Sequence, residues 1–180
     1  FIYNNLQIQN NIINTSYASG VKKLLFVSST CVYPKNCPQP MKETDILSSK
    51  FTKDLQPYCL AKVAGAEMLE ALYSQFNFAS NTVLLPNLYG PGDHYGDDSN
   101  HVIPALIERF YNAKMNNLPE VIVWGNGSAI REFLYIDDAS SGLLELMLNY
   151  DEVLPINLSS QDSLTIKELT EIISEEIKFS

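Results

Sequence analysis

Residues 24–34 read Leu-Leu-Phe-Val-Ser-Ser-Thr-Cys-Val-Tyr-Pro, and the predicted architecture rests on the pattern within them. The first four residues form a short continuous apolar run, which is typical of a strand buried on both faces. Hydroxyl and thiol side chains follow where that strand ends. Because ligands bind at the carboxyl ends of strands in parallel sheets, this segment predicts both a buried strand and a candidate site.

Helical and extended patterns alternate along the rest of the chain. The apolar spacing predicts a helix from Leu6 to Tyr17 that Gly20 ends, and the prolines between 34 and 40 predict a loop. We expect further helices over 58–76, 102–115, 137–149 and 165–177, and extended segments over 82–85, 121–124, 133–136 and 156–158. This alternation predicts an α/β fold, a Rossmann-like doubly wound parallel sheet with helices on both faces.

The composition excludes several classes of protein. Of the 180 residues, 46% are hydrophobic and 18% are charged, which favours a folded domain over disorder. The net charge of −9 argues against a protein that coats nucleic acid or binds membranes through a polybasic surface. The apolar runs are far shorter than the roughly 20 residues of a membrane span. Cys31, Cys37 and Cys59 cannot all pair within one chain, so we expect a reducing compartment, the cytoplasm.

Tyr58 and Lys62 stand four residues apart at the start of a predicted helix. This spacing places both side chains on one face of the helix. A nearby ammonium and the helix N-terminus both favour the phenolate, so we expect them to lower the pKa of Tyr58. Such a tyrosine can donate a proton to a carbonyl group that is being reduced. The alternative is an exposed tyrosine beside an unrelated lysine.

Ser29 and Cys31 follow the predicted strand at 24–27. A hydroxyl at this position can share the negative charge that develops on the same carbonyl oxygen. The thiol would then lie at the mouth of the site. In the alternative, the hydroxyls only end the strand, and Cys31 packs as a small apolar residue.

Together these residues resemble the extended short-chain dehydrogenase/reductase superfamily, whose triad is Ser/Thr, Tyr and Lys. The resemblance rests first on Leu24–Lys35 and on Pro57-Tyr58-x-x-Ala61-Lys62. Four further segments are similar to the GDP-L-fucose synthase family. They are Asn-Leu-Tyr-Gly-Pro at 87–91, Ser-Asn-His-Val-Ile-Pro-Ala-Leu at 99–106, Val-Trp-Gly-x-Gly at 123–127 and Arg-Glu-Phe-Leu at 131–134. The resemblance runs from the first helix to about Asp138 and is weaker beyond it.

This resemblance implies an NADPH-dependent epimerase–reductase that converts GDP-4-keto-6-deoxy-D-mannose to GDP-L-fucose. Ser29, Tyr58 and Lys62 match the family's reductase triad. Cys31 and His101 match the pair that inverts C3 and C5 of the sugar. Protons next to a ketone are acidic enough for a positioned thiolate to remove, and a histidine can return a proton. The alternative for His101 is an ordinary histidine at a helix start.

The resemblance also implies contacts with the cofactor and the substrate. The residues matched to NADP(H) contacts are Val27, Ser28, Ser29, Thr30, Lys62, Leu85, Pro86, Asn87, Leu88 and His101. Arg109, Trp124 and Arg131 match the family's GDP-sugar contacts, for which the alternative is solvated surface arginines and a core tryptophan. The sequence departs from the family at Pro86, which cannot donate a backbone hydrogen bond, and at Ser28, where glycine is frequent. Nothing in the sequence indicates a metal site.

One expected motif is missing. None of the eight glycines belongs to a strand, Gly-rich turn and helix of the kind that holds a pyrophosphate. We interpret Gly125-x-Gly127 as a turn. The chain also begins with Phe1, so we expect it to be part of a longer protein whose Gly-rich loop lies upstream. The 180-residue chain alone should then bind NADPH poorly and turn over no substrate.

These inferences define the predicted organisation. Residues 1–86 form a partial NAD(P)-binding region with the catalytic helix, and residues 87–180 form the remaining strands and part of a substrate-binding region, without a clean separation. The resemblance implies a homodimer, with 6–17 and 58–76 as candidate interface helices. Two other functions stay open: a different NAD-dependent nucleotide-sugar epimerase or dehydratase, and a catalytically inactive Rossmann-fold binding protein.

Overall fold

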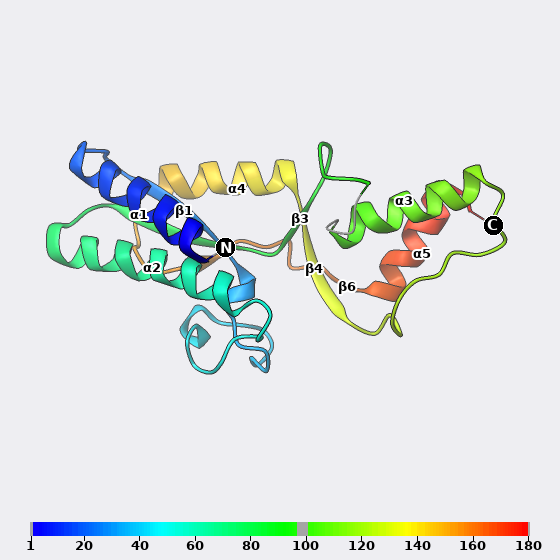
Figure 1. Ribbon diagram of the computed structural model, residues 1–180. Coiled ribbons are helices and arrows are strands. Elements are labelled where there is room, and N and C mark those ends of the chain that lie inside the picture. Colours follow the sequence, from blue (N-terminus) through cyan, green and yellow to red (C-terminus); the bar gives the residue numbers. More distant parts are fainter. Residues whose placement is uncertain (1, 97–100, 180) are drawn as a thin grey trace. The chain divides into compact units, whose positions relative to one another are not determined.

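The computed structural model describes residues 2–96 and 101–179. Phe1, Ser99 and Asn100, which the sequence analysis singled out, lie outside the described residues. Helices and strands alternate along most of the chain (Figure 1). In order, the elements are α1 (Ile2–Ala18), β1 (Leu24–Ser29), the 3₁₀ turns η1 (Thr30–Val32) and η2 (Glu43–Asp45), α2 (Gln56–Phe76), β2 (Ser80–Leu85), β3 (Asn87–Tyr89), α3 (Val102–Met115), β4 (Ile130–Tyr135), α4 (Ile136–Asn149), β5 (Ile156–Asn157), β6 (Ser163–Thr165) and α5 (Ile166–Ile177).

The chain forms two compact units, each built from two separate segments. The first unit contains Phe1–Pro86 and Asp138–Leu158, and the second contains Asn87–Asp137 and Ser159–Ser180. Each unit is described by itself below.

The first unit contains a parallel three-stranded sheet in the order β1-β2-β5. Figure 1 shows α1 and α2 on one side of this sheet and α4 on the other. All six residues of β2 are buried, which confirms the buried strand predicted at 82–85 and extends it to the polar residues Ser80 and Asn81. The Rossmann-like α/β fold is therefore confirmed, with a parallel sheet and helices on both of its faces.

The central helix α2 begins and ends where its sequence dictates. Pro57 occupies the first turn, where its missing amide hydrogen costs nothing, and Asn77 ends the helix in the left-handed conformation. The buried side chains of Ile13, Leu69 and Phe78 form a core cluster between α1, α2 and the start of β2. This packing fixes the position of the helix that carries Tyr58 and Lys62.

One part of the strand prediction is wrong. β1 was expected to be buried on both faces, but Ser28 is its only buried residue and Val27 is 40% exposed. Among the described strands, β1 pairs only with β2, so its other edge is unpaired.

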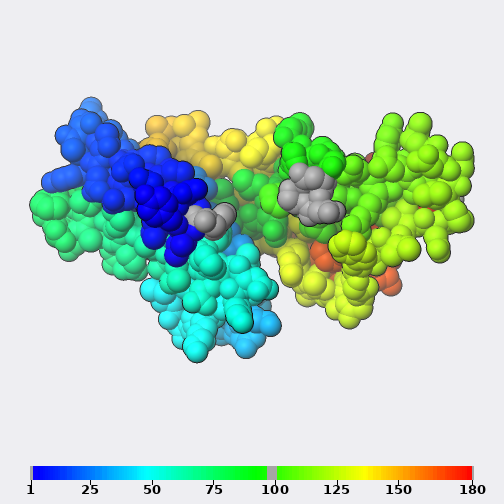
Figure 2. All heavy atoms as spheres, viewed as in Figure 1, coloured from blue at the N-terminus to red at the C-terminus, as the bar shows by residue number. Residues whose placement is uncertain are grey.

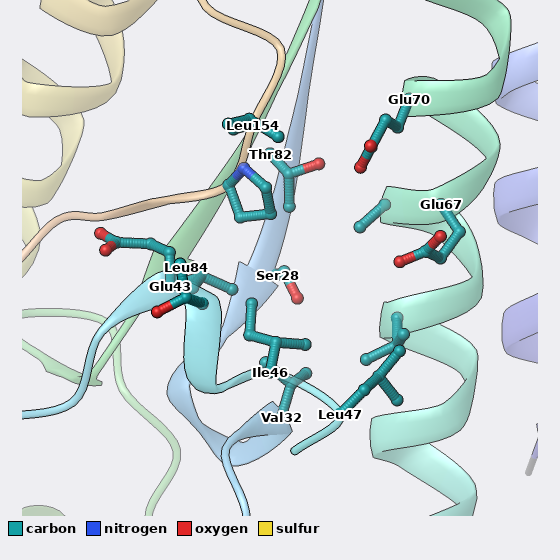
Figure 3. Close-up of a pocket in the computed structure, with 14 residues that line it drawn as sticks. Ser28, Val32, Glu43, Ile46, Leu47, Glu67, Glu70, Thr82, Leu84 and Leu154 are labelled. Atoms are coloured by element: carbon teal, nitrogen blue, oxygen red, sulfur yellow. The ribbon is translucent and has the colours of Figure 1, made fainter. Parts of the chain in front are cut away.

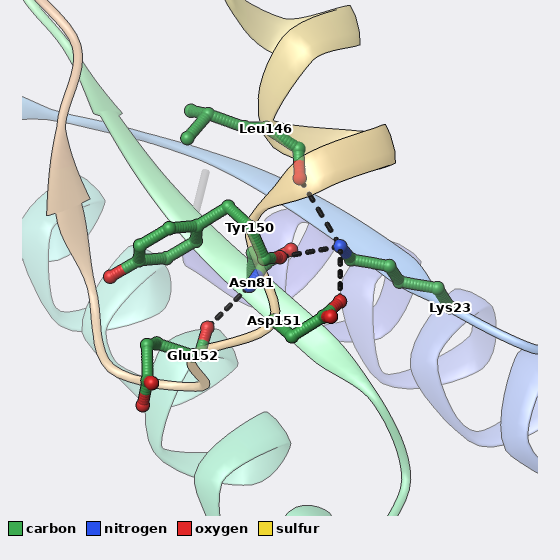
Figure 4. Close-up of polar contacts among 6 residues, drawn as sticks. All are labelled: Lys23, Asn81, Leu146, Tyr150, Asp151 and Glu152. Atoms are coloured by element: carbon green, nitrogen blue, oxygen red, sulfur yellow. Dashed lines mark hydrogen bonds and ion pairs between the residues drawn. The ribbon is translucent and has the colours of Figure 1, made fainter.

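The returning segment Asp138–Leu158 is attached to this sheet by polar contacts (Figure 4). Lys23 donates to the carbonyl oxygens of Leu146 and Tyr150 at the end of α4, and its ammonium pairs with Asp151. A cation at this position complements the negative end of the helix dipole. The side-chain amide of Asn81 donates to the Glu152 carbonyl, so β2 holds the same segment.

The proline-rich segment is a loop, as predicted, and residues 34–55 form a lobe beside the start of α2 (Figures 1 and 2). The buried side chains of Val32 and Tyr33 pack with Val63 and Leu84, and Cys37 packs against them. The Tyr33 hydroxyl donates to Oδ1 of Asn157 at 2.8 Å, which ties the beginning of this loop to β5.

The second unit contains a small mixed sheet in the order β3-β4-β6. β3 pairs with β4 in parallel, whereas β6 pairs with β4 antiparallel. Helices α3 and α5 pack together through Leu106, Phe110, Leu169 and Ile173. The short strands β3 and β6 were not predicted, because three residues carry too little periodicity to identify a strand.

The predicted strand at 121–124 is also wrong. These residues form no strand, although Val121 and Val123 pack against the core of α3 and α5. Ile122 and Trp124 point outward and are exposed. Partly buried and exposed side chains thus alternate along residues 121–124, as in a strand, but this extended segment packs on α3 and α5 and pairs with no described strand. Gly125 and Gly127 then turn the chain towards β4 with positive φ, as predicted.

Candidate active site

The carboxyl ends of β1 and β2 lie side by side, because Ser29 pairs in register with Leu85. Ser29 leaves the strand with an extended backbone and caps η1, where its Oγ accepts a hydrogen bond from the Cys31 amide at 3.2 Å. Thr30 belongs to the same turn, and Pro86 is buried just beyond β2. The predicted residues at 27–31 and 85–86 are thus gathered at one edge of the sheet.

The first turns of α2 bring Tyr58 and Lys62 to the end of β1. The ammonium of Lys62 donates to the Val27 carbonyl at 2.9 Å and lies 5.9 Å from the centroid of the Tyr58 ring. A side-chain hydrogen bond links Tyr58 with Ser29. The structure therefore brings Ser29, Tyr58 and Lys62 together, which excludes the alternative of an exposed tyrosine beside an unrelated lysine.

The electrostatics of this group differ from the sequence expectation. Burial raises the pKa of Tyr58, the charge of Cys31 raises it further, and the hydrogen bond with Ser29 lowers it in part. Lys62 is not among the groups that shift the pKa of Tyr58; its ammonium faces the ring and donates to a backbone carbonyl. Burial lowers the pKa of Lys62 itself. The predicted lowering of the Tyr58 pKa is therefore wrong for this chain, in which the phenol keeps its proton.

The three cysteines occupy different environments. Cys31 is exposed, which excludes the alternative that it packs as a small apolar residue. Cys59 on α2 takes that role: it is fully buried, its thiol donates to the Cys31 carbonyl at 2.9 Å, and burial raises its pKa. The Cys31 amide donates to Oγ of Ser29 at 3.2 Å, which places Cys31 directly beside this residue of the predicted triad. Cys31 is thus the accessible thiol beside the triad.

Ser28 faces a cavity in the first unit (Figure 3). This cavity has a volume of about 210 Å³, and Ser28 and Thr82 extend into it from the sheet. Glu67 and Glu70 face it from α2, and Glu43 from η2. No sequence pattern indicated this cavity, because its walls come from five separate segments.

In the second unit, four of the predicted residues line one cavity of about 380 Å³. They are Asn87, Leu88, His101 and Arg131. His101 precedes the first turn of α3, and its side chain is 79% exposed. Its Nδ1 lies 3.9 Å from a carboxylate oxygen of Asp93, a neighbour that the sequence analysis missed.

Arg109 and Trp124 form a separate stacked pair in the same unit. The Arg109 guanidinium lies 4.5 Å from the centroid of the Trp124 ring. Trp124 is 78% exposed, so the alternative of a core tryptophan is excluded. A stacked guanidinium keeps its donors in plane, where they can bind anionic oxygens while the indole offers an aromatic face.

Two negative findings apply to residues 2–96 and 101–179. They contain no group of three or more His, Cys, Asp or Glu side chains arranged to hold a metal ion. Their helices are too short or too polar to cross a membrane.

Comparison with known sequences identifies one family. The family described as NAD dependent epimerase/dehydratase matches residues 1–158. GDP-L-fucose synthase 1 of Arabidopsis thaliana is 41% identical over 179 residues, which cover 99% of this chain and 55% of that protein. The GDP-L-fucose synthase of Escherichia coli is 37% identical over 188 residues, which cover 99% of this chain and 59% of that protein. The chain thus spans a little over half the length of these curated relatives.

Solved structures agree with the sequence comparison. A GDP-L-fucose synthetase from Naegleria fowleri bound to NADP matches with a TM-score of 0.87 and 28% identity, over all of this chain and 59% of that one. A GDP-mannoheptose C4 reductase from Campylobacter jejuni with NADP bound matches with a TM-score of 0.92 and 30% identity, over all of this chain and 64% of that one. These likenesses confirm the resemblance that the sequence motifs indicated.

Proposed function

The chain belongs to the NAD-dependent epimerase/dehydratase family, and from this premise we propose that it carries the catalytic residues of a GDP-L-fucose synthase. The proposed reaction converts GDP-4-keto-6-deoxy-D-mannose to GDP-L-fucose in two stages, an epimerisation at C3 and C5 and a reduction at C4. One observation supports this proposal above the others: Ser29, Tyr58 and Lys62 meet at the end of β1, with the exposed thiol of Cys31 beside them.

In the epimerisation, we propose that the Cys31 thiolate removes a proton from a carbon next to the C4 ketone. The electron pair moves onto the C4 oxygen, and hydrogen bonds from Tyr58 and Ser29 stabilise the charge there. His101 then delivers a proton to the carbon while the C4 carbonyl forms again. Each inversion thus removes one proton and adds one.

In the reduction, Tyr58 donates its proton to the C4 oxygen. A raised pKa suits this role, because the phenol is protonated when the reaction begins. Lys62 then stabilises the phenolate that remains. Before substrate binds, the ammonium is half-buried with a lowered pKa and bonds only a backbone carbonyl, so it gains a partner when the phenolate forms.

The residues at the ends of β1 and β2 fit a nicotinamide cofactor. Val27 is accessible, and the Lys62 ammonium can donate to a ribose hydroxyl from its place beside the Val27 carbonyl. NADPH, when bound, supplies the hydride that reduces C4. We propose that it is held by the residues at 27–30 and 85–88, by Lys62 and by His101. The described residues contain no glycine-rich turn between a strand and a helix, so they do not provide a pyrophosphate loop.

We propose Arg131, Arg109 and Trp124 as contacts of the GDP-sugar. Arg131 lines the same cavity as His101, and Arg109 stacks on the exposed indole of Trp124. Guanidinium groups bind diphosphate oxygens in a bidentate manner.

We further propose a cytoplasmic homodimer. The exposed side chains of Ile8, Ile12 and Phe76 leave apolar surface on α1 and α2, and no described cysteine is in a disulfide.

The decisive experiment is an assay of the gene product that contains this chain. We expect it to oxidise one NADPH for each GDP-L-fucose formed from GDP-4-keto-6-deoxy-D-mannose. Epimerisation without net NADPH consumption would instead identify an enzyme that keeps its cofactor oxidised after each cycle. Binding of the GDP-sugar without any turnover would favour the inactive binding protein. Sedimentation of the same sample tests the homodimer.

A further inference from the structure

His101 has an acidic neighbour that lies outside the cavity it lines. Oδ1 of Asp93 is 3.9 Å from Nδ1 of His101, which is within ion-pair distance. The Asp93 side chain is only 19% exposed, whereas that of His101 is 79% exposed. Asp93 is not among the residues that line the 380 Å³ cavity. Any effect of Asp93 on a ligand in that cavity would therefore act through the histidine.

The Asp93 carboxylate is held in place by its own loop. Its Oδ1 accepts a hydrogen bond from the His94 amide at 2.8 Å, and the Asp93 amide donates to the Gly90 carbonyl at 3.3 Å. Further along the loop, the Gly96 amide donates to Oε2 of Glu108 on α3 at 3.1 Å. Because α3 begins directly after His101, the same helix anchors the loop that carries the aspartate.

The His101 side chain is not used to cap the helix. His101 occupies the N-cap position with an extended backbone, and its side chain makes no capping hydrogen bond. Serine, threonine, asparagine and aspartate are the usual residues at this position, and their side chains satisfy the first amides. The imidazole therefore keeps both ring nitrogens for other partners, with Nδ1 nearest the Asp93 carboxylate.

We propose that Asp93 is a positioning residue for His101 in the epimerisation, an inference that rests on the proposed function. Its carboxylate accepts a hydrogen bond from Nδ1–H, which fixes the ring orientation and leaves Nε2 to exchange a proton with the substrate. The imidazolium donates its Nε2 proton to the sugar carbon and becomes neutral imidazole with Nδ1–H still facing Asp93. A proton from water restores it. Such contacts are often long in ligand-free enzymes and shorten when substrate binds.

The tautomer of His101 tests this contact directly. Nitrogen-15 NMR of the 180-residue chain distinguishes Nδ1–H from Nε2–H imidazole, and a His94→Gln variant assigns the signals of its two histidines. We expect His101 to favour the Nδ1–H form, and the ratio of Nδ1–H to Nε2–H to fall about fivefold in Asp93→Ala. Asp162→Asn, which alters an exposed aspartate of the same unit, should leave the ratio unchanged.

A second variant separates this role from the loop structure. Asp93→Asn can keep the hydrogen bond to the His94 amide, and unchanged amide signals of His94 and Gly96 would show that the loop is intact. With the loop intact, we still expect the Nδ1–H excess to decrease, because a neutral amide is the weaker acceptor. An identical tautomer ratio in the wild type and both variants would overturn the proposal.

The catalytic consequence is measured in the gene product that contains this chain. Asp93→Asn should slow deuterium incorporation from solvent at the epimerised carbons about tenfold, less than the roughly 100-fold or more expected for loss of the acid itself, because His101 remains. Reduction of an already epimerised substrate should keep its rate. Equal slowing of both stages would indicate a merely structural residue. If the variants change the tautomer ratio but the wild-type gene product turns over no substrate, the proposed function is refuted and the Asp93–His101 contact still stands.

Discussion

Lys62 donates its ammonium proton to the carbonyl oxygen of Val27 at 2.9 Å, and this bond joins the start of α2 to the end of β1. The same ammonium lies over the rings of Phe26 and Tyr58, at 5.1 Å and 5.9 Å from their centroids. A half-buried cation is thus held by one carbonyl and two aromatic faces. None of these partners carries a negative charge, so the ammonium is available to stabilise an anion that forms beside it.

Tyr58→Phe should abolish reduction in the gene product and leave GDP-sugar binding largely intact. The change removes only the hydroxyl that we propose as the proton donor, and the ring stays in its packing environment. NADPH oxidation and calorimetric binding of the GDP-sugar are the measurements. Tyr73→Phe, at an exposed position of the same helix, is the matched control. Reduction at the wild-type rate in Tyr58→Phe would remove this residue from the mechanism.

Cys31→Ser should stop deuterium exchange at C3 and C5 and spare the reduction of an already epimerised substrate. A serine hydroxyl is far less acidic than a thiol, so it cannot serve as the base. Mass spectrometry of the recovered sugar measures the exchange. Cys37→Ser changes a thiol that packs in the loop beside α2, and it should exchange normally. Unchanged exchange in Cys31→Ser would assign the base to another group.

Lys62→Met should change how stability depends on pH. Burial lowers the pKa of Lys62 below its ordinary value of 10.5, so between the two pKa values the unfolded chain binds more protons than the folded chain. The free energy of unfolding contributed by this group therefore rises with pH in that interval. Denaturant unfolding at a series of pH values up to 10.5 should show the rise in the wild type and its absence in Lys62→Met.

The control for this measurement is Lys53→Met, which removes an exposed lysine just before α2. We expect it to keep the wild-type slope. If Lys62→Met also keeps that slope, burial does not penalise the ammonium in the folded chain.

Gly65→Ala should destabilise the first unit by about 1–3 kcal/mol, the usual cost of overpacking. A β-carbon at this position would lie 2.5 Å from Cζ of Phe26 and 3.2 Å from Cδ of Gln9. The ring that it displaces is the one that faces Lys62. Chemical denaturation gives the loss, and Ser74→Ala at an exposed position of the same helix is the control. A stability equal to that of the wild type would mean that Phe26 moves aside without cost.

The sequence predicted the main helices and the parallel strands of residues 1–86 because their patterns are local. Helix α2 has a proline at its start, an asparagine at its end and apolar residues between them, and β2 ends in the apolar run Val83–Leu85. The meeting of Ser29, Tyr58 and Lys62 could be predicted because Tyr58 and Lys62 share a helix face and Ser29 ends a strand, and the family resemblance added the triad role that we propose for them. Each of these signals is local in the chain.

The rest could not be predicted because it depends on contacts between distant segments. The run at 121–124 has the residues of a strand, but pairing requires a neighbouring strand, and the core of α3 and α5 takes its apolar side chains instead. The stacking of Arg109 on Trp124 joins positions fifteen residues apart in sequence, with no periodic relationship between them. Asp93 precedes His101 by eight residues, and no sequence pattern indicates that their side chains approach each other.

Because each unit takes its residues from two separate segments, neither can be isolated by cutting the gene once. A shortened chain ending at Pro86 would lose β5 and α4, and with them the partners of Tyr33, Lys23 and Asn81. Expressing the first unit alone would require a designed connection from residue 86 to residue 138. Truncation libraries of this chain should therefore yield few folded products, whereas insertions that keep both segments of a unit should be tolerated more often.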